Sequence, residues 1–80
     1  MPTVLRVKGY RFFFFSLEGE EAPHIHVEYG EKVAKYWLDP VNLASSYGFR
    51  GRELTKVRAI VIENRINFWE RWNEHFSHSI

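Results

Sequence analysis

Two histidines and a glutamate alternate with aliphatic residues in the segment PHIHVE, residues 23–28. Side chains of an extended chain point to opposite faces in turn, so this spacing places His24, His26 and Glu28 on one face. The two intervening aliphatic residues share the other face, which has the character of a hydrophobic core. Two imidazoles and a carboxylate on one surface could act together on a metal ion, a phosphate or a proton.

The residues that follow extend this surface. A tight turn at Gly30-Glu31, where glycine can adopt positive φ, predicts an antiparallel hairpin. In that register Lys35 lies opposite His26, and Trp37 lies opposite His24. The face predicted to be open to ligands therefore carries His24, His26, Glu28, Lys35 and Trp37.

A metal site is the less favoured use of this face. Two histidines are fewer ligands than a stable site requires, and cysteine is absent. A third ligand could come from Glu28, Asp39 or His75, but no recognised ligand spacing marks any of them. We therefore predict neither a metal nor another cofactor.

Acid–base catalysis on RNA is the second use considered. It requires a histidine that titrates near neutral pH, a second proton-transfer group and a cation for the phosphate. His24, His26 and Glu28 supply the first two as candidate catalytic residues, and Lys35 supplies the third. No Ser-His-Asp order or phosphate-binding glycine loop accompanies them. We rank catalysis below binding, and the sequence leaves open whether the protein is an enzyme.

Binding of nucleic acid is the third use. Phe13, Phe15 and Trp37, next to basic residues, resemble in chemistry a sheet that stacks unpaired bases and holds phosphates. The common alternative is that such aromatic residues belong to the core. Arginines of the later helix could also grip phosphate, although a salt bridge to Asp39 or Glu28 is the safer expectation. The candidate binding residues are Lys35, Trp37, Asp39, Arg6, Arg11, Arg58 and Arg65.

Composition predicts one small globular domain over residues 1–80, with 45% hydrophobic and 18% aromatic residues. A chain of this size buries only roughly 60% of its unfolded surface, so self-association as a homodimer would stabilise it. The net charge of +1 gives no global attraction to nucleic acid, which requires a local patch instead. No leader and no membrane-spanning stretch are expected, and we predict a cytoplasmic protein without membrane contact.

The order of the elements predicts an α+β fold of two layers. Residues 3–7 and 10–17 form a first hairpin, residues 18–22 a polar loop, and residues 24–38 a second hairpin. Asp39-Pro40 resembles a helix start, so we predict a short helix that ends at Gly48. A long C-terminal helix is predicted from about Arg52 to Phe76, followed by a frayed tail at His78. This gives a four-stranded antiparallel sheet of two hairpins packed against a short and a long helix.

The long helix carries an apolar arc that is wider than one sheet requires. Its central stripe is Leu54, Val57, Val61, Phe68, Trp72 and Phe76. Ile62, Ile66 and Trp69 lie on its shoulders, which predicts self-association or binding of a partner protein there. Arg58 and Arg65, seven residues apart, are predicted to point into the arc and to need anionic partners.

Five segments run through nearly the whole chain: MPTVLR, GYRFFFFS, PHIHVE, AKYWLDPV and REL. Together they resemble the small prokaryotic family called domain of unknown function 4160. Members look like the first gene of compact pairs, commonly beside a member of domain of unknown function 2442. That arrangement resembles type II toxin–antitoxin modules.

The resemblance implies a small partner protein encoded by the neighbouring gene, and brings no established activity. It emphasises His24, His26, Glu28, Trp37 and Asp39, which lie in the matching motifs. The favoured interpretation is therefore a component of a toxin–antitoxin-like pair that binds a partner protein, with RNA or operator DNA as a further partner. The alternatives are a histidine-dependent ribonuclease of the toxin type and a purely structural partner-binding module.

Overall fold

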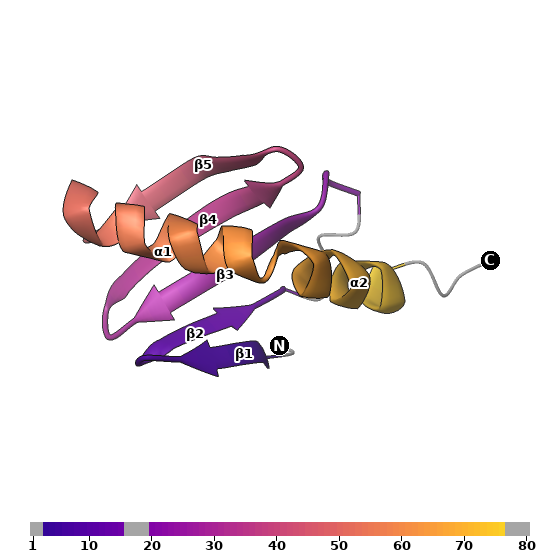
Figure 1. The fold of residues 1–80 in the computed structure, drawn as a ribbon, viewed down its shortest axis with the longest axis horizontal. Coiled ribbons are helices and arrows are strands. Elements are labelled where there is room, and N and C mark those ends of the chain that lie inside the picture. The colour runs from indigo at the N-terminus through magenta and orange to yellow at the C-terminus, as the bar shows by residue number, and fades with distance from the viewer. Residues whose placement is uncertain (1–2, 16–19, 77–80) are drawn as a thin grey trace.

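A computed structural model describes residues 3–15 and 20–76, and it forms two layers (Figure 1). The elements are β1 (Thr3–Val7), β2 (Tyr10–Phe13), β3 (His24–Tyr29), β4 (Lys32–Leu38), β5 (Val41–Tyr47), α1 (Gly51–Glu63) and α2 (Arg65–Phe76). The strands form one antiparallel sheet in the order β1-β2-β3-β4-β5. Both helices lie on the same side of this sheet (Figure 1). The predicted α+β class and two-layer arrangement are confirmed.

The hairpin of β3 and β4 has the predicted register. Trp37 lies opposite His24, Lys35 opposite His26, and Val33 opposite Glu28. Gly30 occupies the turn with a φ of 60°, a conformation that glycine adopts without a steric penalty. The period of two and the turn chemistry were therefore sufficient to predict which residues of the two strands share a face.

The first hairpin follows the prediction over most of its length. Leu5 pairs with Phe12 and Arg6 with Arg11, but an irregularity near the start of β1 places Thr3 opposite Phe13 where Val4 was expected. Strand β2 ends at residue 13, before the predicted end at residue 17. Residues 16–19, which include part of the predicted polar loop, and His78 lie outside the described residues.

The predicted short helix after Asp39-Pro40 is wrong. This dipeptide, joined by a cis peptide bond, forms the turn between β4 and β5. Asp and Pro are typical of turns as well as of helix starts, so the local signal has two meanings. Long-range pairing decides between them, because a strand at residues 41–47 satisfies the backbone of β4 and buries Val41 opposite Leu38.

The long helical segment is present but divided at Asn64. Asn64 has a φ of −108° and a ψ of 13°, outside the helical region, and both its backbone and side-chain amides donate to the carbonyl of Ile60. The predicted stripe is buried at its centre: Val57, Val61, Phe68 and Trp72. In Figure 1, α1 crosses the sheet and α2 continues past it after the break.

The prediction that Arg58 and Arg65 point into the apolar arc is wrong, because both are exposed. The sheet covers only a narrow stripe of the helices, so the arginines and the apolar shoulder remain outside the contact. Arg58 nevertheless acts on the core electrostatically: burial raises the pKa of Tyr36, and the Arg58 guanidinium partly opposes this rise. The Tyr36 hydroxyl donates to the carbonyl of Leu54 at 2.9 Å and so ties β4 to α1.

Two phenylalanines of the run 12–15 test which face of the sheet carries the hydrophobic core. Phe12 is fully buried and its ring lies 5.4 Å from that of Phe68, whereas Phe15 is 41% exposed. Phe12→Ala should lower the free energy of unfolding by about 3–5 kcal/mol. Phe15→Ala should lower it by about 1 kcal/mol or less. Urea denaturation checks this order, and equal losses would contradict the assignment of the core to the helix side.

Candidate functional site

The candidate site is the side of the sheet that faces away from the helices. Register and alternation assign its residues, because cross-strand neighbours point to the same side. We call this surface the open face; its members are Arg6, Arg11, Phe13, His24, His26, Glu28, Val33, Lys35, Trp37, Asn42, Ser45 and Tyr47. It brings together the two histidines, Glu28, Lys35, Trp37 and the two N-terminal arginines of the sequence prediction.

His26 lies at the centre of an aromatic cluster on the open face. Its ring is stacked 5.5 Å from Phe13, with which it pairs across β2 and β3. Phe15 meets the imidazole edge-on at 4.6 Å, and His24 does so at 5.1 Å. The His26 side chain remains partly exposed. The aromatic residues of the β2 segment therefore pack on the imidazole instead of forming a separate surface.

His24 differs from His26, because its side chain is completely buried. Its Nδ1 lies 2.9 Å from the carbonyl oxygen of Ala22, and the imidazole is 4.8 Å from the Trp72 ring of α2 and 5.6 Å from Trp37. The prediction of a shared face holds, but the implied solvent access does not. An enclosed imidazole cannot touch a bound phosphodiester, so His24 has the surroundings of a packing residue.

Arg11 and Glu28 form an ion pair across β2 and β3. Arg11 also donates from Nε to the Thr3 hydroxyl at 2.8 Å, and its guanidinium carbon lies 4.4 Å from the centroid of the Phe13 ring. Three contacts thus orient one cation. The Glu28 carboxylate accepts from this arginine. It is therefore already engaged in an ion pair.

Lys35 forms the second cation–aromatic pair. Its ammonium lies 4.6 Å from the centroid of the Trp37 ring, two positions along the same strand. The same ammonium donates to Glu21 at 2.6 Å, and the Glu21 side chain is itself well exposed. An exposed ion pair of this kind contributes only about 0–1 kcal/mol, so another anion can replace the carboxylate at small cost.

Strand β5 supplies a part of the open face that the sequence did not predict. Tyr47 is 73% exposed and lies opposite Val33, and Ser45 lies opposite Lys35. With His26, Ala34 and Ser46, these residues line a shallow hollow of ≈ 260 Å³. They were missed because residues 41–47 were interpreted as a helix. Pairing with β4, which aligns Val41 with Leu38, is the signal that could have revealed them.

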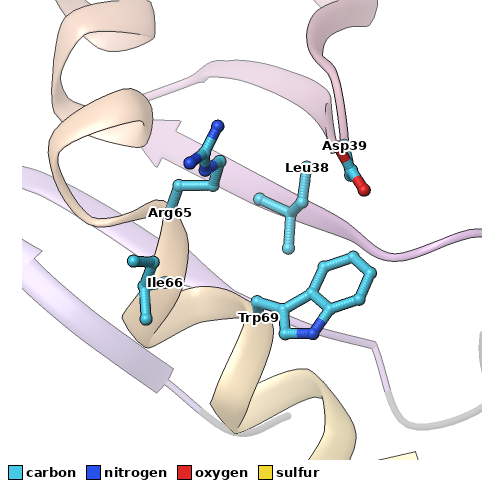
Figure 2. Close-up of a pocket in the computed structure, with 5 residues that line it drawn as sticks. All are labelled: Leu38, Asp39, Arg65, Ile66 and Trp69. Carbon is cyan, nitrogen blue, oxygen red and sulfur yellow. The ribbon is translucent and has the colours of Figure 1, made fainter.

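The remaining predicted residues lie elsewhere. Asp39 and Arg65 line a groove on the helix side with Leu38, Ile66 and Trp69, as Figure 2 shows. Arg58 projects from α1 and is exposed. The expected salt bridges from these arginines to Asp39 or Glu28 are not formed within residues 3–15 and 20–76.

Metal binding finds no support in the geometry of the described residues. Among them, no group of three or more histidine, aspartate, glutamate or cysteine side chains is arranged to hold an ion. The third ligands considered from sequence do not complete the pair: Glu28 is bound to Arg11, and Asp39 lines the groove on the helix side. His75 contacts the rings of Phe14 and Phe76.

Comparison with known proteins gives one match. Residues 9–73 match the model of a family described as Domain of unknown function (DUF4160). No curated protein and no solved structure matches the chain. Neither of the two described helices has the length and apolar character needed to cross a bilayer.

The burial of His24 leads to a prediction that separates the two histidines. His24→Ala should lower the free energy of unfolding by roughly 2–4 kcal/mol, because it leaves a cavity beneath Trp72. His26→Ala is the matched control and should cost about 1 kcal/mol or less, since the ring is partly exposed. Thermal and urea unfolding of both variants measures the difference. A His24 variant as stable as the wild type would contradict the packing role.

Proposed function

Because the chain belongs to a family of unknown function, DUF4160, we propose its function from the open face: this face binds single-stranded RNA. In this proposal the protein is a cytoplasmic, non-enzymatic component of a toxin–antitoxin-like pair. The observation that carries it is the cation–aromatic pair of Lys35 over the partly exposed Trp37 on a helix-free sheet face that also exposes the rings of Phe15 and Tyr47. Such a surface supplies the two interactions that single strands need, base stacking and phosphate contact. Phe13, beneath Arg11, is buried and holds that arginine in place.

Exposed rings at both ends of the face support the proposal. Phe15 lies beside the His26 cluster, and Tyr47 projects from β5 at the far side. Between them, the hollow beside Lys35 and Ser45 offers a cation and a hydroxyl group. Because every base has a π-face, the exposed rings of Phe15 and Tyr47 can stack bases with little sequence preference. The expected ligand is a single strand whose bases are already unpaired.

The charges of the open face are compatible with this ligand although the whole chain carries only +1. Arg6 is exposed, and Lys35 is held by an exposed carboxylate that a phosphate can replace. Arg11 keeps its place through Thr3, Phe13 and Glu28, so it provides a preorganised cation. Phosphate contacts of this kind make affinity depend steeply on salt.

The partner protein is the second part of the proposal, and it rests on the family resemblance. Because the family that the chain resembles looks like the first gene of compact pairs, we propose that a small protein from the neighbouring gene binds this chain. Co-expression of both genes, followed by purification through a tag on one of them, tests this directly. Recovery of the tagged chain alone, at a salt concentration that preserves folded complexes, would contradict it.

The ribonuclease alternative receives less support from the geometry. Of its three proposed catalytic residues, His24 is enclosed and the carboxylate of Glu28 is engaged by Arg11. General acid–base cleavage needs two proton-transfer groups within reach of the phosphodiester. The purely structural alternative predicts an open face that binds no nucleic acid. Incubation of wild type and His26→Ala with labelled RNA separates the enzyme from the other two classes, since only an enzyme shortens the RNA in a His26-dependent manner.

Trp37 provides the main test of RNA binding. Trp37→Ala should weaken binding of a fluorescent single-stranded oligouridylate by about 1–3 kcal/mol, because a stacking platform and the support of Lys35 are lost. Trp69→Ala, which removes the partly exposed tryptophan on the helix side, is the matched control and should leave affinity unchanged. Fluorescence anisotropy at several salt concentrations measures both effects.

The outcomes distinguish the proposal from its alternatives. Affinity for the single strand should fall steeply between low and high salt in the wild type, as phosphate contacts require. Binding that is independent of salt, equal losses in the two tryptophan variants, or a preference for duplex operator DNA over the single strand would each overturn the proposed mode.

A further inference from the structure

The groove on the helix side is a second surface that the open face does not explain. Its floor and walls are apolar residues from the end of β4 and from α2: Leu38, Ile66 and Trp69. Ile66 is 66% exposed, and Trp69 beside it is 36% exposed. Ile62, at the end of α1, is also exposed. Large apolar side chains grouped in this way on a small protein indicate an interaction surface.

Opposite charges flank this groove without meeting each other. Figure 2 shows Arg65 on the helix at one margin of the groove and Asp39 at the other, with Leu38 between them and Trp69 below. Both charged residues are exposed, and their side chains form no ion pair with each other in the structure. An occupant complementary to the groove presents apolar atoms together with one cation and one anion.

The same patch on a second molecule meets this requirement. In a twofold interface every contact between two different residues occurs twice, once in each direction. Arg65 of one copy can therefore pair with Asp39 of the other copy at two symmetric positions. The groove has a volume of ≈ 210 Å³. An apolar cavity of about 150 Å³ accepts a benzene-sized group, so there is room for the side chain of Ile66 from the other copy.

We propose that this groove is the interface of a homodimer, in which Ile66 of each copy enters the groove of the other and Arg65 pairs with Asp39 across the twofold axis. The described residues expose 5356 Å². A standard interface removes about 800 Å² from each partner, which is a modest share of that surface. Because the groove lies on the helix side, the open face of each copy stays accessible.

A charge exchange tests the pairing, and it uses no RNA, so its result is independent of the proposed function. D39R and R65D should each weaken dimerisation at least about tenfold, because each places like charges opposite one another in both contacts. An equimolar mixture of D39R with R65D should restore association to within about threefold of the wild type. In the mixed dimer both contacts again join opposite charges. Sedimentation equilibrium of the purified chains measures all of these.

Matched variants exclude a general effect of charge. Lys56→Asp and Glu63→Arg make similar charge changes at exposed positions of α1 that do not line the groove, and both should dimerise like the wild type. Ile66→Asp should abolish dimerisation while circular dichroism shows an unchanged fold. A wild type that stays monomeric at millimolar concentration, an Ile66→Asp protein that still dimerises, or a mixture no better than its separate components would each overturn the proposal.

Discussion

Burial of Ile25 and Val27 beneath the helices is the constraint on which the rest of the structure depends. Both side chains are completely buried, and β3 is the central strand of the sheet. Because side chains alternate along a strand, hiding these two sends His26 and Glu28 to the opposite side. Pairing with β2 and β4 then places Arg11, Phe13 and Lys35 beside them. Burial of these two aliphatic side chains thus positions the candidate binding residues on the opposite face, where Phe13 is itself buried.

This arrangement divides the chemistry between two surfaces. The open face carries cations held against aromatic rings, and the helix side carries aliphatic residues and tryptophans. His24 lies on the open face but is inaccessible there, because Trp72 and the segment that precedes β3 enclose it. A histidine pair that suggests catalysis in the sequence is therefore divided into one packing residue and one residue with access to a ligand.

The sequence was sufficient for features that depend on local patterns. The register of β3 and β4 followed from the alternation of residues 24–28 and from Gly30, and the buried stripe of the helices followed from its period. Features that depend on distant contacts were not predictable. Asp39-Pro40 suits a turn or a helix start, and only the pairing of β5 with β4 decides. The burial of His24 requires Trp72, far along the chain.

The exposure of Arg58 and Arg65 is a third case of this kind. The helical period places an apolar arc on the helix, but it does not say how much of that arc the sheet covers. The break at Asn64 lies in the polar run Glu63-Asn64-Arg65, where asparagine is a common helix end, but this signal was outweighed by the apolar stripe on both sides of it. The unpartnered part of the arc, with Arg65 and Asp39 at its margins, became visible only when the turn between β4 and β5 was placed beside α2.

The three tryptophans allow one measurement to test the central claim, because each reports on a different environment. Trp37 lies on the open face, Trp69 lines the groove, and Trp72 is buried. In a ¹⁵N–¹H spectrum, titration with single-stranded RNA should shift the indole signal of Trp37 and leave those of Trp69 and Trp72 in place. A shift confined to Trp69, or no shift of any indole at saturating RNA, would contradict binding on the open face.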